Sequence, residues 1–442
     1  MLQVITAKLK LDTTPEQKDL LREVTLAYRD ALNYASQVSF ENGFIANGTK
    51  LQKLVYQDIR SEYKLPSQMA CNVPRQVGAT YKGLLTKLKQ NQQAIGKGFT
   101  KKRFKGLDAP PRYTSRTCTL NYLRDFTFKP ERQVSIITLT GRITVPYSGY
   151  NKHLALIKEG AKIGAAKIWY SKSSKTYYLL VSLELDLPEI QPTDLKRVVG
   201  VDVGRRYLAV ACDVQNKTQF FSGSEAIHKA NRYQRARKTL QQKGTRRATR
   251  RLVALSGRER RFTADINHQI SARIVTPNTL FGLEELTHIR ERTIPKKTAK
   301  KASKKQRKAN RKQAKWSFAE LHSFIDYKSI LASSITVKVD ADYTSKGCPC
   351  CGHVSGESRP DKGLVFHCVS CGFELHADLV GARNIALRVL LSRQDWERTG
   401  VLSVRPDVSS REAKAERLQR YSELRWSLDT SPRCTSKEVS AG

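Results

Sequence analysis

The sequence predicts a multidomain protein in which a helical region and a β-rich region precede an α/β domain that carries a metal-binding insert. Three observations support this fold class. The chain has 442 residues, enough for two to four domains at about 150 residues each. Helical and then strand patterns follow one another over residues 1–195, and strands and helices alternate after them. Near the end of the alternating region, four cysteines form two closely spaced pairs.

The first half of the chain combines helices with short strands. Residues 2–11 alternate apolar and polar side chains, which predicts a strand. Residues 15–92 then have a helical pattern with breaks near 42–50 and 65–74. From about 105 to 195, short β patterns are separated by turn residues. We expect an all-β barrel or sandwich there, which the first strand joins.

The second half has the element order of an α/β domain. From 197 to 392 the patterns predict three strands, long helices, a strand, a helix, a strand, a cysteine-rich loop and a final helix. Residues 397–442 have no apolar stripe longer than two turns. We therefore expect a mobile tail, in which residues 411–426 could form a helix.

The charge of the chain indicates a polyanionic partner. It contains 79 Lys or Arg and 40 Asp or Glu, which gives a net charge of +39 at pH 7 and a pI near 10.0. Two segments, 229–261 and 290–315, each hold 13 basic residues and one acidic residue. Basic surfaces of this kind supply most of the affinity of proteins for nucleic acids. We predict nucleic-acid binding; the alternative is a solvated helix face or a basic arm without specific contacts.

The composition argues against other classes of protein. No apolar run reaches about 18 residues, so no transmembrane span is predicted. Residues 1–17 lack the apolar core of a signal peptide. Nine cysteines are too few for a disulfide-rich scaffold. We expect a cytoplasmic, nucleoid-associated protein with no membrane partner.

The cysteine pairs are the strongest local signal. Two C-x2-C pairs are separated by 16 residues, and each pair is followed by Gly. Four thiolates at these spacings match one tetrahedral structural zinc site, with no open position for catalysis. A redox pair is the alternative, and Cys350, His353 and His367 are close enough in sequence to compete as ligands. The four predicted ligands are Cys348, Cys351, Cys368 and Cys371.

Three acidic residues stand where a predicted strand or helix begins or ends. Asp202 interrupts the β pattern of residues 198–210, and Glu284 lies near the end of the β pattern of residues 279–286. Asp378 precedes the last helix, where it could instead be a simple N-cap. Buried carboxylates are costly unless they are paired or bind metal. The three could therefore hold two Mg²⁺ ions for phosphodiester hydrolysis, and three unrelated acids are the alternative.

Together these motifs resemble the TnpB family of transposon-encoded RNA-guided DNA nucleases, which are related to the type V CRISPR effectors. The resemblance rests on GVDVG around Asp202, LEEL around Glu284, and YTSKGCPCCG and HADLVGARN around the cysteines and Asp378. It is specific over about 197–390, weaker before this region, and does not cover the tail. Val380 stands where the family often has Asn, but this departure removes no metal ligand.

The resemblance implies a RuvC-like nuclease domain of RNase H fold with an inserted zinc finger, preceded by a helical recognition lobe and an oligonucleotide-binding-like wedge β-barrel. It implies that Asp202, Glu284 and Asp378 bind two Mg²⁺ ions and catalyse DNA cleavage, and that the cysteines hold one structural Zn²⁺. The expected domains are the first barrel strand at 1–12, the helical recognition domain at 13–104, the wedge barrel at 105–195, the nuclease domain at 196–342 and 376–396, the zinc finger at 343–375 and the tail at 397–442.

The resemblance also implies the partners. A guide RNA from the transposon end would pair with double-stranded target DNA, and one protein copy would bind each RNA. The alternatives are a miniature CRISPR effector with the same chemistry, a cleavage-inactive RNA-guided regulator, and a transposase with its own acidic trio. The insert just before the third acid favours the nuclease over the transposase.

Two further sets of nucleic-acid contacts are predicted. Asn72 and Gln76 lie one helical turn apart near Pro74 and could read adenines of a flanking motif, although Asn72 could simply cap the helix. Residues of the two basic segments should bind phosphates without sequence preference. These residues are Arg246, Arg247, Arg250, Arg251, Lys296, Lys297, Lys304 and Lys305.

Overall fold

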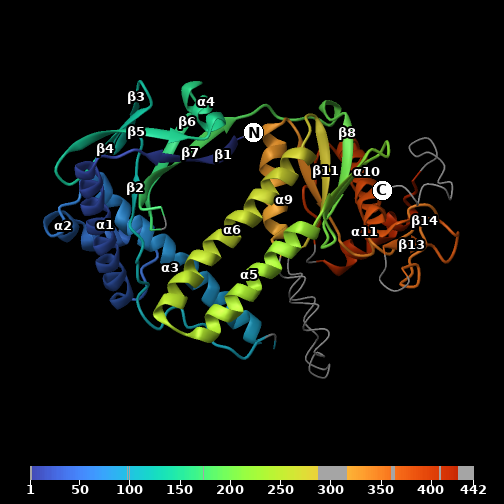
Figure 1. The fold of residues 1–442 in the computed structure, drawn as a ribbon, viewed down its shortest axis with the longest axis horizontal. Helices are drawn as coiled ribbons and strands as arrows, with labels where there is room; N and C mark the ends of the chain where they lie inside the picture. The colour runs from blue at the N-terminus through green and yellow to red at the C-terminus, as the bar shows by residue number, and fades with distance from the viewer. Residues whose placement is uncertain are drawn as a thin grey trace. The chain divides into compact units, whose positions relative to one another are not determined.

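Strand β1 (Leu2–Leu11) begins the first of two units into which the chain divides, residues 1–188 and 189–442 (Figure 1). The computed structural model describes residues 2–96, 98, 100–172, 174–286, 316–359, 364–407 and 410–426. Among these residues, no helix is both long and apolar enough to cross a lipid bilayer.

Three long helices follow β1 in the first unit. Helix α1 begins with a capping box, in which the Thr14 hydroxyl accepts from the Gln17 backbone N–H and the Gln17 side chain accepts from the Thr14 N–H. The sequence predicts a break in the helical pattern at 65–74. Of these residues only 65 and 66 lie outside a helix, because α3 begins at Ser67 and continues through Pro74. Burial of Met69, Val73 and Val77 at helical spacing outweighs the backbone bond that proline cannot donate. The helices are α1 (Pro15–Glu41), α2 (Gly48–Ser61) and α3 (Ser67–Gly96).

The rest of the first unit is one antiparallel sheet with the strand order β2-β6-β7-β1-β5-β4-β3. As predicted, β1 joins this sheet, between β7 and β5. Its two edge strands, β2 and β3, are joined by residues 121–125 alone, so the sheet must curve until its edges approach each other, as in a barrel. One short helix, α4 (Asn151–Lys158), interrupts the predicted all-β region. The strands are β2 (Thr117–Leu120), β3 (Phe126–Lys129), β4 (Gln133–Ile137), β5 (Arg142–Gly149), β6 (Lys162–Ser171) and β7 (Thr176–Asp186).

The second unit is built on a mixed five-stranded sheet with the order β10-β9-β8-β11-β12. Strand β8 is antiparallel to β9 and parallel to β11, which is in turn parallel to β12. The predicted order of strands and helices over 197–392 is confirmed. The strands are β8 (Arg197–Asp202), β9 (Tyr207–Asp213), β10 (Thr218–Ser222), β11 (Thr279–Glu284) and β12 (Ile335–Val339).

Helices cover both faces of this sheet. Ile270 of α6 and Leu321 of α9 pack against one face, in a core with Val199 and Val201 of β8. The opposite face packs against α10, whose Ile385 shares a core with other sheet residues. Helices α5 and α6 form an antiparallel pair that carries most of the first basic segment (Figure 1). The helices are α5 (Ser224–Lys243), α6 (Arg246–Ile274), α9 (Phe318–Leu331) and α10 (Ala377–Thr399).

The predicted mobility of the tail is wrong for residues 410–426. Helix α11 (Arg411–Glu423) forms within residues 411–426, the segment of the tail for which the sequence allowed a helix. Its Arg417 Nε lies 2.8 Å from the carboxylate of Asp340, and Arg420 pairs with Asp395 of α10. Ion pairs therefore hold α11 where an apolar stripe is missing. Residues 427–442 and the second basic segment, 290–315, lie outside the described residues.

Candidate functional site

The first two predicted carboxylates lie next to each other because β8 and β11 are neighbouring parallel strands. Val201 pairs with Leu283, so the next residues, Asp202 and Glu284, leave their strands at the same edge of the sheet. Glu284 is 9% exposed and also pairs with Val339 of β12. Two carboxylates are thus brought together by strand register alone.

The third carboxylate is brought to this edge by α10. A Cβ atom at Gly200 would lie 2.1 Å from the carbonyl oxygen of Ala382, so only glycine lets the helix lie this close to β8. Gly381 is in direct contact with Asp202, since a Cβ there would be 2.9 Å from Asp202 Oδ2. Asp378 stands about one helical turn before Gly381. Its carboxylate lies close enough to Asp202 to raise the pKa of that acid.

Asp378 does not cap α10, so the simple capping alternative is wrong. The N-cap is His376, whose Nδ1 accepts a hydrogen bond from the Asp378 backbone N–H at 3.3 Å. The carboxylate of Asp378 instead lies 3.5 Å from the guanidinium of Arg359, in the loop of the cysteine-rich insert. Arg359 was not predicted, because no pattern distinguishes it from other loop arginines.

The three carboxylates lie close together, and little of their surface is exposed to solvent. Burial raises the pKa of Asp202 well above its usual value, and the neighbouring carboxylates Glu284 and Asp378 raise it further. Burial also raises the pKa of Glu284, an effect that a hydrogen bond from Thr344 partly offsets. Oxygen ligands of this kind suit Mg²⁺, and a bound divalent cation would relieve their repulsion. The three neighbouring acids are therefore a candidate divalent-cation site.

Glu285, next to Glu284 in sequence, has a different environment. It is 5% exposed, its backbone N–H donates to the Val339 carbonyl, and its carboxylate lies 3.9 Å from Lys338 Nζ. The two residues have different neighbours: Glu284 is close enough to Asp202 to raise its pKa, whereas Glu285 lies beside a lysine. Of the two, Glu284 stays the predicted site residue.

The four predicted cysteine ligands form a compact cluster. All their sulfur atoms lie within 4.8 Å of one another. The Sγ atoms of Cys348 and Cys371 are 3.7 Å apart, and those of Cys351 and Cys368 are 3.5 Å apart. Tetrahedral zinc with Zn–S bonds of about 2.3 Å requires sulfur separations of roughly 3.8 Å. The cluster can hold a metal ion, and its thiolate set fits zinc.

The cysteine cluster is packed against the helix that carries Asp378. Cys348 and Cys368 share a buried core with Ala377 and Val380 of α10. Strands β13 (Val365–His367) and β14 (Glu374–His376) form a small hairpin that leads from the cluster into α10. Cys350 is exposed and outside the cluster. A metal bound here would stabilise the start of α10.

The amide groups of Asn72 and Gln76 contact the protein interior. Asn72 is 5% exposed and donates to the Thr119 carbonyl at 3.2 Å, so it does not cap α3. The Gln76 Oε1 atom accepts from the hydroxyls of Tyr28 and Thr119. These bonds support strand β2, and the reading of a flanking motif by Asn72 and Gln76 stays a prediction.

The first group of predicted phosphate contacts lies at the start of α6. Arg246, Arg247, Arg250 and Arg251 are all exposed. Elsewhere on the α5–α6 pair, a groove of about 910 Å³ is lined by several cations, including Arg235, Lys238 and Arg260. The other four predicted contacts, Lys296, Lys297, Lys304 and Lys305, lie outside the described residues.

Parts of this chain are similar in sequence to known proteins. Residues 318–385 match the family model "Cas12f1-like, TNB domain". A CRISPR-associated endodeoxyribonuclease Cas12f1 of Sulfoacidibacillus thermotolerans is 24% identical over 245 residues, which cover 51% of this chain and 53% of the relative. A TnpB-like protein of Methanocaldococcus jannaschii is 30% identical over 134 residues, which cover 29% of this chain and 44% of the relative.

Solved structures match over a longer span but with lower identity. The Cas12f1–sgRNA–target DNA complex aligns with 84% of this chain and 81% of that chain, at 15% identity and a TM-score of 0.48. The chain spans about half the length of the curated relatives it matches. The relatives and the family model confirm the predicted resemblance.

We expect Cys371→Ser to lower bound zinc from one ion per chain to well below one, because three thiolates leave the tetrahedral site incomplete. The variant should also unfold at lower temperature. Elemental analysis and thermal unfolding of the purified full chain measure both effects. Cys350→Ser is the matched control and should keep its zinc, because Cys350 lies outside the cluster. Equal zinc content in the two variants would contradict the assignment.

We expect Asp202→Asn to stabilise the metal-free protein at pH 7. The pKa of Asp202 is raised, so its contribution to stability is greatest at low pH and is lost as pH rises through the folded-state pKa. The variant should therefore be more stable than the wild type at pH 7, and the difference should shrink towards pH 4 or when Mg²⁺ is added. Urea unfolding in a chelating buffer measures it.

The control variant for this measurement should change the free energy of unfolding in the opposite direction. A hydrogen bond from Arg420 lowers the pKa of Asp395, so Asp395→Asn should destabilise the protein at pH 7. If Asp202→Asn destabilised the metal-free protein as Asp395→Asn does, the proposed repulsion among the carboxylates would be wrong.

Proposed function

Because the chain is a relative of the TnpB and Cas12f1 proteins, we propose that it is an RNA-guided DNA endonuclease. In this proposal, residues 196–342 and 376–396 form a RuvC-like nuclease domain with a zinc-binding insert at 343–375. Residues 13–104 form the recognition domain, and β1 with residues 105–195 forms the wedge barrel.

One observation carries the nuclease assignment: three carboxylates from separate elements meet at one edge of the sheet. Asp202 and Glu284 arrive by strand register, and Asp378 arrives by the contact of α10 with Gly200. The arrangement raises the pKa of Asp202, which is a cost to the fold. Costly charge clusters of this kind are typical of functional sites.

The residues of the site would act together on a DNA phosphodiester. Asp202, Glu284 and Asp378 would hold Mg²⁺, which supplies an activated water and stabilises the leaving 3′ oxygen. Arg359, now 3.5 Å from Asp378, could turn to a phosphate once the carboxylates are neutralised. Because Glu284 is buried, its side chain would keep a fixed position while a DNA strand binds at the site.

The basic surfaces would hold the guide RNA and its duplex with target DNA. The exposed arginines at the start of α6 and the cations along the α5–α6 groove suit a nucleic-acid backbone. Base pairing with the guide would then select the target, and a short flanking motif would be read by the N-terminal half. We propose one protein copy per RNA and a cytoplasmic, nucleoid-associated location.

The source of the guide distinguishes two forms of this proposal. The chain would use RNA from a transposon end, as in TnpB proteins, or CRISPR RNA, as a miniature type V effector. Sequencing the RNA that co-purifies with the protein separates them. A cleavage-inactive regulator is disfavoured because all three acids are present and brought together.

We expect Asp202→Asn, Glu284→Gln and Asp378→Asn each to lower cleavage of a guide-matched plasmid by at least about 100-fold, because each removes a metal ligand. RNA-guided DNA binding should change by less than about threefold, because no basic contact is lost. Plasmid cleavage with Mg²⁺ and a gel-shift assay measure the two activities.

Glu285→Gln is the matched control for the Glu284 variant. It makes the same chemical change at the next residue, beside Lys338 rather than among the three acids. It should cleave at close to the wild-type rate. Normal cleavage by any one of the three acid variants would remove that residue from the site.

We expect the fourfold substitution of Arg246, Arg247, Arg250 and Arg251 by Gln to weaken guide-RNA binding. Each lost phosphate contact should flatten the slope of log affinity against log salt by roughly 0.7–0.9, and thus by up to about 3 in all. The fourfold Arg→Lys variant keeps the charge and should keep most of the slope. An unchanged slope in the Gln variant would place the nucleic acid elsewhere on the protein.

A further inference from the structure

Glu284 receives a hydrogen bond from a threonine that was not predicted as a site residue. The Oγ1 atom of Thr344 lies 2.6 Å from Glu284 Oε1, and the threonine is 4% exposed. The same hydroxyl lies 3.2 Å from the Ala341 carbonyl. A hydroxyl has one proton to donate, and the shorter, charge-assisted contact is with the carboxylate.

The backbone on both sides of Thr344 is held by α10. The side-chain amide of Asn384 donates to the Thr344 carbonyl at 2.7 Å and to the Gly347 carbonyl at 2.8 Å. Arg388, one turn further along α10, donates to the Asp340 carbonyl and, at 2.8 Å, to the Asp342 carbonyl. The loop that carries Thr344 is therefore tied to the helix that carries Asp378.

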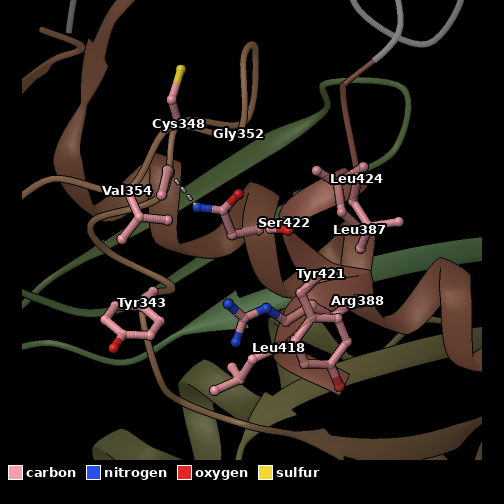
Figure 2. A pocket seen from close by; sticks show the side chains of 12 residues that line it. Tyr343, Cys348, Gly352, Val354, Leu387, Arg388, Leu418, Tyr421, Ser422 and Leu424 are labelled. Carbon is pink, nitrogen blue, oxygen red and sulfur yellow. Dashed lines mark hydrogen bonds between the residues drawn. The ribbon is translucent and has the colours of Figure 1, made fainter. Parts of the chain in front are cut away.

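Helix α11 covers the other side of Arg388. The guanidinium of Arg388 lies 4.5 Å from the centre of the Tyr421 ring, and Figure 2 shows the two side chains next to each other. Arg417 pairs with Asp340 and Lys414 pairs with Asp342, so α11 contacts the same loop directly. Few alternative positions are left for the loop or for Thr344.

We propose that Thr344 is a positioning residue for Glu284, an inference that rests on the proposed nuclease function. Its hydroxyl donates to Oε1 at 2.6 Å and so holds this oxygen in one place. The second oxygen, Oε2, would then keep a fixed orientation in which it could bind a cation. Thr344 would thus act through Glu284 and not as a metal ligand itself.

Thr344→Val and Thr344→Ser test this role. Valine keeps the size of threonine but removes the hydroxyl, whereas serine keeps the hydroxyl. Because valine removes a charge-assisted hydrogen bond, it should raise the Mg²⁺ concentration for half-maximal cleavage by about tenfold or more. Serine should stay within about twofold of the wild type.

Metal binding supplies a readout that does not depend on cleavage. Mn²⁺ is titrated into the full-length, RNA-free chain, and free Mn²⁺ is followed by electron paramagnetic resonance. The specific binding is the part that Asp202→Asn removes. Thr344→Val should weaken this part by about tenfold, and Thr344→Ser should leave it within twofold of the wild type.

Thr399→Val is the matched control. The exposed Thr399 hydroxyl donates to the Asp395 carbonyl near the end of α10, away from the acids, so its loss should change neither metal dependence. Thermal unfolding of each variant shows whether it is folded. If Thr344→Val is unfolded, Thr344→Ala replaces it, because alanine fits the same space without strain.

The outcomes separate the two proposals. If Glu284→Gln abolishes cleavage but the folded Thr344→Val variant keeps the wild-type dependence on Mg²⁺ and Mn²⁺, the role of Thr344 is overturned and the nuclease proposal stands. If Glu284→Gln cleaves normally, the nuclease site itself is wrong. Equal weakening by valine and serine would also overturn the inference, since serine retains the hydroxyl.

Discussion

Helix α10 can bring Asp378 to the two strand carboxylates only because it lies directly on the sheet. Glycines occupy the central positions of both strands beneath it. A Cβ at Gly200 would collide with the helix backbone, and one at Gly282 would lie 2.4 Å from a Val389 methyl carbon. This approach also aligns Asn384 and Arg388 with the loop above the site. The geometry of the candidate site therefore depends on glycine, which has no side chain, at positions 200 and 282.

The same close packing creates an electrostatic cost. Three carboxylates share a poorly solvated space, where like charges repel more strongly than in water. The structure offsets part of this cost with specific groups rather than with solvent: Thr344 donates to Glu284, and Arg359 lies near Asp378. Arg359 comes from the cysteine-rich insert. The insert thus contributes to the charge balance of the site as well as to the stability of α10.

Most of the candidate site could be predicted from the sequence because its signals are local. An acid at the end of an apolar strand, or two cysteines three residues apart, can be recognised without knowing what lies opposite. Thr344 could not be recognised in this way, since a threonine in a loop has no pattern and its role depends on a carboxylate 60 residues away. His376 was missed for a related reason, because its ring accepts the capping bond that an aspartate usually accepts.

The errors in the fold have the same physical origin. Pro74 and the polar surface of α11 both suggest an absence of regular structure when only local preferences are considered. In the protein, buried apolar residues on both sides of Pro74 keep α3 helical at the proline, and ion pairs hold α11 in place. Tertiary contacts override propensity wherever enough of them converge on one short segment.

These contacts also explain why the end of the described chain matters to a site that begins at residue 202. The backbone N–H of Trp426 donates to the Pro349 carbonyl in the cysteine-rich insert, and its ring packs near the Arg383 guanidinium on α10. Together with the pairing of Arg417 and Asp340, these contacts join α11 to the insert, to α10 and to the loop of Thr344. Each of these three elements supplies a group that touches one of the acids. A displacement of α11 would therefore loosen all three supports together, whereas loss of any single acid would leave the supports in place.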